Sequence, residues 1–447
     1  MIKIYDTMTR SLRDFVPLTE NVVNMYVCGP TVYNYIHIGN ARSAVAFDTI
    51  RRYFEYCGYT VNYISNFTDV DDKIIKAANE AGISTKELSD KFIAAFMEDT
   101  GQLGIKPATQ NPRVINYMDE IIAFVSTLVD KGFAYVSEGD VYFRVAKSNN
   151  YAKLANKTLE DLEIGASGRT DAETERKENP LDFALWKAAK EGEVSWDSPW
   201  GPGRPGWHIE CSVMATEILG DTIDIHGGGA DLEFPHHTNE IAQSEAKTGK
   251  TFANYWMHNG FVNVDNEKMS KSLGNFVTVH DMLKTVDGQV LRFFLATQQY
   301  RKPINFTEKA IHDAEVNLKY LKNTHSLPLT DQVNQDELQT YLEAFQEAMD
   351  DDFNTANGVT VLFDMAKWIN SGNYDQTVKD AFEKMLQVFG IVFEEEVLDE
   401  DIEKLIEERQ AARANKDFAT ADRIRDELAA QGIKLLDTKE GVRWTRD

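Results

Sequence analysis

The segment from residue 24 to residue 42 constrains the fold, because it reads as a buried strand, a Gly/Pro loop and the start of a helix. The apolar run ending at Val27 is followed by Gly29-Pro30-Thr31-Val32-Tyr33-Asn34-Tyr35-Ile36-His37-Ile38-Gly39-Asn40-Ala41-Arg42. After the helix comes a second strand-like run, Thr60 to Asn66. A strand, a crossover helix and a second strand form a βαβ unit, so the pattern predicts an α/β fold with a Rossmann-like parallel sheet.

A second half of this sheet is expected after the Gly/Pro-rich joint at 200–206, with strands at Asp221 to Ile225 and Ala253 to Asn259. Ligands of such sheets bind beyond the carboxyl ends of the strands, near the crossover between the two halves. The arrangement therefore predicts that one rim of the sheet carries Cys28, His37 and His226.

Two distant segments together suggest an ATP site. Lys268-Met269-Ser270-Lys271-Ser272-Leu273-Gly274-Asn275 places two lysines three residues apart in a loop that can grip a polyphosphate. The helix that begins near His37 offers unpaired backbone N–H groups and a positive dipole end, which attract phosphate. Either segment alone is usually a surface loop or a turn, but both occur here in the expected order.

In these two segments the chain resembles the class I aminoacyl-tRNA synthetases, whose signatures are HIGH and KMSKS. The second signature is complete, whereas Asn40 replaces the last histidine of the first. Asparagine can donate a hydrogen bond to phosphate but cannot become cationic. The resemblance implies that His37, Asn40, Lys268 and Lys271 are catalytic. Nucleotide contacts are expected from Gly39, His37, Lys271 and the glycines Gly227 and Gly228, which permit close backbone approach.

Four scattered residues form a candidate metal site: Cys28, Cys211, His236 and Glu240. If a helix begins near Pro235, His236 and Glu240 lie one turn apart on the same face. Zinc accepts thiolate, imidazole and carboxylate ligands. By spacing alone, each residue could equally be a core cysteine, a capped histidine or a surface acid.

Further motifs resemble the cysteinyl-tRNA synthetase family over almost the whole chain. They are Met25-Tyr26-Val27-Cys28-Gly29-Pro30-Thr31-Val32-Tyr33, Phe67-Thr68-Asp69-Val70-Asp71-Asp72-Lys73, Pro205-Gly206-Trp207-His208-Ile209-Glu210-Cys211-Ser212, Asp224-Ile225-His226-Gly227-Gly228-Gly229-Ala230-Asp231-Leu232 and Phe234-Pro235-His236-His237. The resemblance implies one zinc ion per chain, held by Cys28, Cys211, His236 and Glu240, that receives the thiol of L-cysteine. It also implies ATP with Mg2+ as a substrate, cysteinyl-adenylate as the intermediate, tRNA(Cys) as the acceptor, and a monomer.

The residues expected to bind the amino acid are Gly29, Thr31, Thr68, Trp207, His226 and Asp231. Two of them have competing structural roles. Trp207 could belong to the core, and Thr68-Asp69 could cap a helix from Val70 to Gly82.

The chain of 447 residues is too long for one hydrophobic core. The expected order is a first half of the catalytic domain at 1–107, an insertion on the acceptor-end side at 108–199 and a second half at 200–262. The lysine-rich loop and a stem-contact region follow at 263–306, then a helical bundle at 307–400 and a small anticodon-binding domain at 401–447. Within the insertion, 164–178 is predicted to be a flexible surface loop, and Trp444 in the last domain is either a base-stacking or a core residue.

Net charge and cysteine content narrow the alternatives. A formal charge of −25 argues against simple nucleic-acid binding, and the basic residues of the tail alternate with acids. Three cysteines do not make a disulfide framework, and Cys57 is expected to be a small buried hydrophobe. No signal peptide and no apolar stretch long enough for a bilayer are evident, so a cytoplasmic location without membrane contact is expected.

Two other functions stay open. A ligase could make cysteinyl-adenylate and pass cysteine to an amino sugar, as in mycothiol synthesis. Such an enzyme would have little use for the helical bundle and the basic tail. A zinc-stabilised RNA-binding protein without catalysis is the other, and the intact lysine loop and His37 speak against it.

Overall fold

The structure is a computed structural model that describes residues 1–166, 174–270, 274–331, 333–395 and 398–447. The chain forms two compact units, Met1–Val392 and Phe393–Asp447. The predicted domain boundary at 400/401 falls inside the second unit. Lys271 and residues 167–173 of the predicted surface loop lie outside the described residues.

The centre of the first unit is a four-stranded parallel sheet in the order β10-β9-β3-β4. Its strands are β3 (Val22–Val27), β4 (Thr60–Ser65), β9 (Ile223–Gly229) and β10 (Ala253–Asn259). The two halves of the fold meet where β3 pairs with β9. The predicted α/β fold with a parallel sheet is confirmed, and the carboxyl ends of β3 and β9 mark the place where ligands of such sheets bind.

Helix α1 (Ile38–Tyr56) connects β3 to β4 and packs on the sheet. Its Phe47 is fully buried, and a Cβ atom added to Gly227 would lie 2.4 Å from the Phe47 ring. The glycine run therefore lies inside β9, where it lets α1 approach. The prediction that the strand ends at Ile225 is wrong for this reason.

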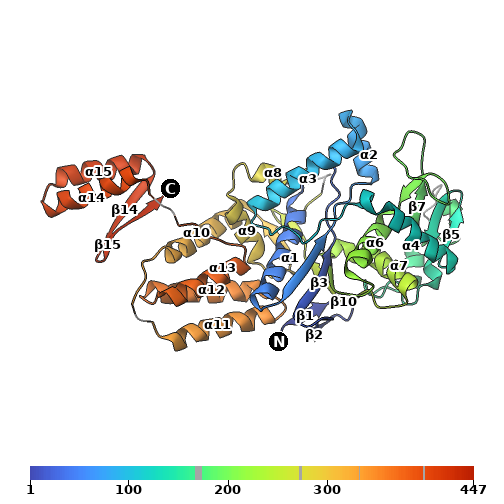
Figure 1. The fold of residues 1–447 in the computed structure, drawn as a ribbon, viewed down its shortest axis with the longest axis horizontal. Coiled ribbons are helices and arrows are strands. Elements are labelled where there is room, and N and C mark those ends of the chain that lie inside the picture. Colours follow the sequence, from blue (N-terminus) through green and yellow to red (C-terminus); the bar gives the residue numbers. More distant parts are fainter. Residues whose placement is uncertain (167–173, 271–273, 332, 396–397) are drawn as a thin grey trace. The chain divides into compact units, whose positions relative to one another are not determined.

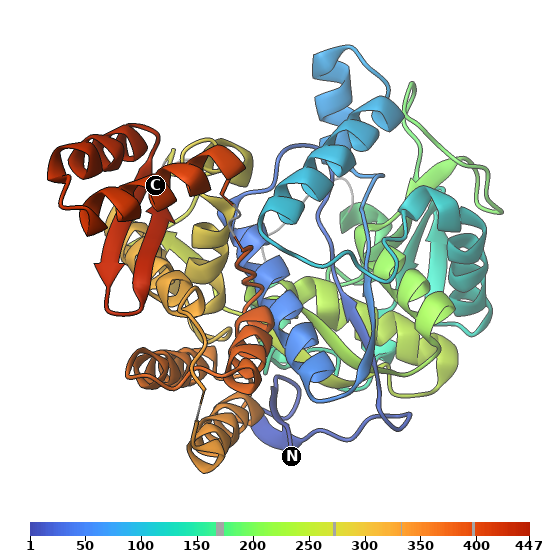
Figure 2. The ribbon, with the colours of Figure 1, turned by 60° about the vertical axis from the view of Figure 1, so that its left-hand side comes forward.

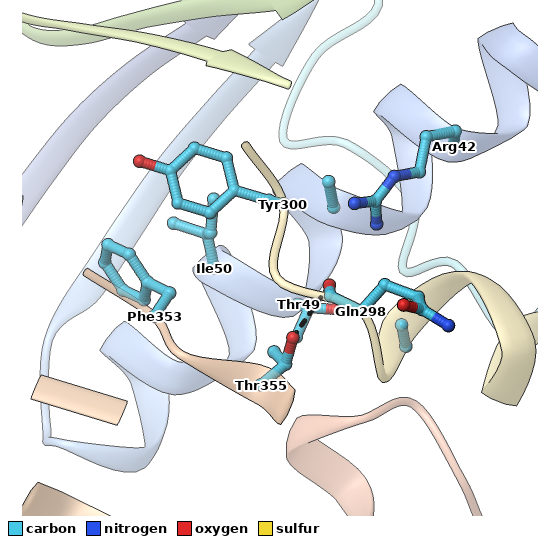
Figure 3. Close-up of a pocket in the computed structure, with 9 residues that line it drawn as sticks. Arg42, Thr49, Ile50, Gln298, Tyr300, Phe353 and Thr355 are labelled. Carbon is cyan, nitrogen blue, oxygen red and sulfur yellow. Dashed lines mark hydrogen bonds between the residues drawn. The ribbon is translucent and has the colours of Figure 1, made fainter. Parts of the chain in front are cut away.

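The other side of α1 faces α9 (Gly288–Ala296) and the segments that follow it. In Figure 2, α1 is the blue helix at the centre of the view. Arg42 is 1% exposed and donates to the backbone oxygens of Leu295 at 2.7 Å and Gln299 at 2.9 Å. Figure 3 shows Arg42 beside a small cavity of ≈ 10 Å³, across which Thr355 donates to the Gln298 carbonyl oxygen. A buried guanidinium thus ties α1 to the last turn of α9 and to the chain that follows it.

The insertion between the halves contains helices and an antiparallel sheet in the order β5-β6-β7-β8. Its elements, with the two helices that precede them, are α2 (Asp72–Ala81), α3 (Thr85–Gln102), η1 (Val114–Tyr117), α4 (Met118–Asp130), β5 (Ala134–Ser137), β6 (Asp140–Phe143), η2 (Val145–Lys147), α5 (Leu159–Ala166), η3 (Thr174–Arg176), β7 (Phe183–Ala188) and β8 (Gly203–Pro205). Asp71, not Thr68-Asp69, caps α2, because its side chain accepts from the Lys73 amide. The predicted loop at 164–178 begins as the end of α5.

The remaining elements of the first unit include a helical bundle. They are the hairpin β1 (Lys3–Asp6) and β2 (Ser11–Asp14), helices α6 (Trp207–Leu219) and α7 (Thr238–Thr248), turns η4 (Ala230–Leu232) and η5 (Glu233–His237), strands β11 (Val262–Val264), β12 (Glu267–Lys268) and β13 (Ile304–Phe306), and helices α8 (Val279–Met282), α10 (Glu308–His325), α11 (Gln335–Asp350), α12 (Thr355–Asn370) and α13 (Gln376–Val388). Figure 1 shows α10 to α13 on one side of the central sheet and the insertion on the other.

The second unit has its own core. Helices α14 (Glu400–Ala414) and α15 (Phe418–Ala430) pack on the hairpin β14 (Ile433–Thr438) and β15 (Gly441–Arg446). The half-buried Trp444 packs against this core. Arg409 donates twice to Asp437, at 3.0 and 2.9 Å. These contacts fit the core alternative for Trp444 and show ion pairing of one basic residue of the tail.

Two further sequence predictions concern exposure. Cys57 is exposed, so the prediction of a buried residue is wrong: it ends α1 at the surface, where Gly58 turns the chain with a φ of +95°. Across the described part of the chain, every helix is either too short or too polar to cross a membrane.

Candidate active site and metal-ligand cluster

The structure brings four predicted ligands together at the carboxyl end of β3. Cys28 follows this strand, Cys211 lies on α6, His236 lies in η5 and Glu240 lies in the first turn of α7. Their ligand atoms all lie within 4.8 Å of one another. The Cys28 and Cys211 sulfurs are 3.7 Å apart, and the His236 Nε2 and Glu240 Oε2 atoms are 3.6 Å apart. Two sulfurs, one nitrogen and one oxygen are a donor set that suits zinc.

His236 and Glu240 do not lie in one helix that begins near Pro235, as the sequence predicted. Helix α7 begins at Thr238, and η5 precedes it with a non-helical Phe234 (φ −144°, ψ 132°). The chain around His236 is nevertheless coiled tightly enough for the ring to meet the Glu240 carboxylate.

A second group of possible ligands, Cys28, His226, His237 and Glu240, shares two residues with the first. Metal-bound histidines donate their other ring N–H to an acceptor. His236 satisfies this condition, because its Nδ1 lies 3.0 Å from the Nδ1 of His208. His226 does not, because its buried Nδ1 has no hydrogen-bond partner among the described residues. The first group therefore fits a metal better.

His226 supports the first group from behind. It is fully buried in β9, and its Nε2 lies 3.0 Å from the Glu240 Oε1. This contact leaves the other carboxylate oxygen, Oε2, which is nearer His236 and Cys28, available to bind a metal ion. His226 thus orients Glu240. The prediction that Cys28, His37 and His226 share one rim of the sheet holds in part, because Cys28 and His226 both contact the Glu240 carboxylate.

Burial governs the ionisation of the cluster. Burial and the neighbouring Cys211 and Glu240 raise the pKa of Cys28 well above its ordinary value. Burial and nearby histidines lower the pKa of His236 and of His237, so both imidazoles are neutral. Burial also raises the pKa of Glu240, although the contact with His226 opposes the rise. A cation among these groups would favour the thiolate and carboxylate forms that ligate metals.

Sequence reasoning missed several polar neighbours of the cluster. The Nε2 of His237 lies 3.4 Å from the Cys28 sulfur, and its Nδ1 lies 2.8 Å from the Nε2 of His258. The Nδ1 of His258 in turn lies 2.7 Å from the Thr7 hydroxyl. The adjacent His236-His237 pair was the only local signal for this chain of contacts, because Thr7 and His258 are remote in sequence.

Asn66 is a further residue that the sequence did not single out. It follows β4, is 1% exposed, and accepts through Oδ1 from the Gly29 amide at 3.0 Å. Its Nδ2 donates to the Thr68 hydroxyl at 3.1 Å. Thr68 also forms an isolated parallel bridge with Thr31. Three predicted substrate residues, Gly29, Thr31 and Thr68, therefore lie together beside the cluster.

Trp207 and Asp231 border the site from two other elements. The Trp207 ring is 43% exposed and stacks on His236, with ring centroids 4.4 Å apart. The alternative that Trp207 is a core residue is therefore wrong. Asp231 is exposed in η4, next to Gly229.

The two phosphate-binding segments also meet. The Ile38 amide donates to the Val277 carbonyl at 3.0 Å, and the His37 ring packs edge-on against Phe276 at 4.7 Å. His37 and Asn40 cap α1 reciprocally: the His37 ring accepts from the Asn40 amide and the Asn40 Oδ1 accepts from the His37 amide, both at 3.2 Å. Asparagine fits this capping position, which gives the departure from the HIGH signature a structural role.

The start of the lysine loop is described as far as Ser270. Lys268 lies in β12, and its Nζ is 5.5 Å from the centre of the Phe261 ring. Met269 approaches the start of α1, because a Cβ atom added to Gly39 would lie 3.5 Å from its Cε. The position of Lys271 lies outside the described residues.

Known protein families match this chain along its length. Residues 14–316 match the tRNA synthetases class I (C) catalytic domain, residues 344–394 the DALR domain, and residues 395–444 the cysteinyl-tRNA ligase anticodon binding domain. Methionyl-tRNA synthetase from Mycobacterium tuberculosis, solved with methionyl-adenylate, shares the fold with a TM-score of 0.60 at 15% identity, over 82% of this chain and 89% of that one. Fold and site together define a class I tRNA synthetase.

The relatives narrow this class. Cysteine–tRNA ligase from Streptococcus thermophilus strain CNRZ 1066 is 95% identical over the whole of both chains. The enzymes of the same name from Streptococcus agalactiae serotype III and Streptococcus pyogenes serotype M6 are 82% and 83% identical, again over both whole chains. The chain belongs to the cysteinyl-tRNA ligase family.

Proposed function

We propose that this chain is a cysteine–tRNA ligase that selects its amino acid through a zinc ion held by Cys28, Cys211, His236 and Glu240. The single observation that carries the metal proposal is the convergence of the four ligand atoms within 4.8 Å at the carboxyl end of β3. The full-length likeness to cysteine–tRNA ligases supports the reaction. The reaction joins L-cysteine to the AMP part of ATP with release of pyrophosphate, and then transfers cysteine to the 3′ end of tRNA(Cys) with release of AMP.

Selection of cysteine over serine requires more than shape, because a pocket discriminates such near-isosteres by only about a hundredfold. When bound, zinc supplies a soft Lewis acid that favours a thiolate over an alcohol as its ligand. The protein supplies the geometry: two thiolates, a neutral imidazole supported by His208, and a carboxylate supported by His226.

The remaining residues have proposed roles in binding and positioning. Gly29, Thr31 and Thr68 border the place for the amino and carboxylate groups of cysteine, with Trp207 and Asp231 at its edge. The positive end of α1, with His37, Gly39, Gly227 and Gly228, receives ATP with its Mg2+ ion. Lys268 and Lys271 stabilise charge on the reacting phosphates, and no side-chain nucleophile is needed, because the cysteine carboxylate attacks the α-phosphate directly. Asn40 acts mainly as the capping partner of His37.

The acceptor is proposed to be tRNA and not an amino sugar. The match of residues 395–444 to an anticodon binding domain supports this choice, because a sugar acceptor gives no reason for such a domain. We also propose that the enzyme is a monomer in the cytoplasm, where its three cysteines would stay reduced.

The metal proposal is tested by comparing Cys211→Ala with Cys57→Ala. The first change removes a proposed ligand, whereas the second makes the same substitution at an exposed cysteine. Zinc content and cysteine-dependent ATP–pyrophosphate exchange are measured on the same samples. We expect Cys211→Ala to lose zinc and at least about a hundredfold of the exchange rate, since the missing interaction selects the substrate, and Cys57→Ala to keep both. Full zinc occupancy in Cys211→Ala would refute the ligand set.

A further inference from the structure

We propose that Asn66 is a positioning residue that makes the Thr68 hydroxyl a hydrogen-bond donor toward the carboxylate of the bound amino acid. This inference rests on the proposed function, in which Thr68 borders the place for cysteine. It adds the residue that sets the direction of the Thr68 hydrogen bond.

The orientation of the Asn66 amide follows from its partners. The Gly29 backbone N–H can only donate, so the Asn66 side-chain atom that faces it at 3.0 Å is the amide oxygen, Oδ1. The amide nitrogen then faces the Thr68 Oγ1 at 3.1 Å, and there it can only donate. The Thr68 oxygen is therefore the acceptor of this bond.

This polarity leaves the hydroxyl hydrogen of Thr68 unused. Thr68 is 3% exposed, and its hydroxyl makes no other hydrogen bond within the described residues. A buried donor without an acceptor costs about 1–3 kcal/mol. A substrate carboxylate would accept this hydrogen, whereas a substrate ammonium group has no acceptor and would leave it unsatisfied.

An irregular register explains why a side chain occupies this place. Partners in β3 and β4 differ by 38 in residue number up to Val27 and Ser65, but the next bridge, Thr31 with Thr68, differs by 37. One extra residue therefore lies in the segment after β3 that contains Cys28, and the Gly29 amide bonds to the Asn66 side chain in place of a backbone carbonyl. The bridge continues with bonds from the Thr68 amide to Pro30 and from the Val32 amide to Thr68.

The backbone also holds Asn66 in place. A Cβ atom added to Gly29 would lie 1.7 Å from the backbone carbonyl oxygen of Asn66, so the two backbones are in contact. With its backbone against Gly29 and both amide atoms bonded, Asn66 has little freedom to turn. The polarity of Thr68 is thereby fixed before the substrate arrives.

The experiment uses Asn66→Asp in the full-length, zinc-loaded protein. The carboxylate keeps an acceptor for the Gly29 amide but has no donor, so the Thr68 hydroxyl must turn and donate to it. Binding is measured by calorimetry for L-cysteine, for 3-mercaptopropionate, which lacks the amino group, and for cysteamine, which lacks the carboxylate. We expect the first two to bind about tenfold more weakly or worse, and cysteamine to bind unchanged within about threefold.

Thr68→Val separates polarity from charge, because it removes the donor without adding a carboxylate. We expect the same pattern for the three probes as with Asn66→Asp. In the double variant the losses should not add, because Asn66 acts through Thr68. If Asn66→Asp does not fold, Thr68→Val alone tests the donor. Additive losses would show that the new charge acts directly and would overturn the proposal, as would a comparable loss of cysteamine binding.

Asn62→Asp is the matched control. Asn62 lies on β4, the strand that Asn66 follows, and donates to the Asn24 side chain at 2.9 Å, so the change also replaces a half-buried, bonded amide with a carboxylate. We expect unchanged binding of all three probes. Zinc content is measured on every variant, because the Asn66 Oδ1 lies 3.8 Å from the Cys211 sulfur. Failure of the unaltered protein to hold zinc or bind any thiol would instead refute the proposed function.

Discussion

Glu245 lies half-buried on α7, the helix whose first turn carries Glu240. Burial raises its pKa from 4.5 to about 6, although Lys153 opposes the rise. A folded-state pKa above the unfolded value means that the folded protein binds the proton more tightly. The ionised carboxylate therefore costs stability above pH 6, and this cost fades as the pH falls from 6 to 4.5.

We expect Glu245→Gln to raise the free energy of unfolding by about 1 kcal/mol at pH 8, after allowance for solvent screening of a partly exposed group. The gain should shrink toward pH 5. Urea unfolding at both values measures it, with Glu217→Gln on the exposed side of α6 as the control. A gain of equal size at both pH values would show that packing, and not charge, is responsible.

At the scale of elements, Arg292 on α9 joins four helices. Its guanidinium is fully buried and contacts Asp48 at 2.7 Å and Thr49 at 3.1 Å, both on α1. It also donates to the carbonyl oxygens of Leu103 after α3, at 3.4 Å, and Phe389 after α13, at 2.9 Å. Burial alone would raise the pKa of Asp48, but Arg292 and Arg52 bring it below its ordinary value. The pair thus holds the catalytic sheet's first helix against the bundle.

Arg292→Met should lower the free energy of unfolding by about 3–5 kcal/mol, because it removes one partner of a buried charge pair. In an Asp48→Asn background the same change should cost less, since no carboxylate is left without this partner. A double-mutant cycle by urea unfolding measures the difference. Arg423→Met, at a side chain that is 67% exposed, is expected to change stability by less than about 0.5 kcal/mol. Equal costs of Arg292→Met in both backgrounds would rule out coupling to Asp48.

The same scale shows what the sequence could predict. Alternating strands and helices were enough for the parallel sheet, and β10 spans the predicted residues, Ala253–Asn259. The extent of β9 was missed because a glycine run reads as a loop until Phe47 is known to pack against it. Hydrophobic periodicity reports local structure, whereas this packing joins residues far apart in the chain.

The candidate site divides in the same way. Cys28, Cys211, His236 and Glu240 were found from resemblance to a family, and their spacing alone left bland alternatives open. Their supporting contacts could not be predicted, because the motifs that contain His208 and His226, and the strand end at Asn66, do not show which residues these side chains face. They become informative only when the fold shows which ring nitrogen or amide atom faces which ligand.

At the scale of the whole molecule, the division after Val392 predicts separable functions. The second unit has its own core of Leu398, Ile402, Ile424, Leu428 and Ile433. A chain ending at Val392 should therefore fold and keep cysteine-dependent ATP–pyrophosphate exchange within about twofold. Charging of tRNA(Cys) should fall by about tenfold or more, the equivalent of about 1.4 kcal/mol of lost interaction.

Thermal unfolding of the shortened chain is the control for this experiment. An unchanged transition together with lost exchange would mean that the second unit contributes to activation. A lower transition with lost exchange would mean that it stabilises the first unit. Either result would contradict separable functions.

The contact between the backbones of Gly29 and Asn66 limits how this enzyme can be redesigned. Any side chain at position 29 would have to occupy the space of a carbonyl oxygen 1.7 Å away. A library randomised there should return glycine alone among active clones. Efforts to broaden the range of accepted thiol amino acids should therefore begin at Trp207, whose exposed ring can be replaced by a smaller side chain.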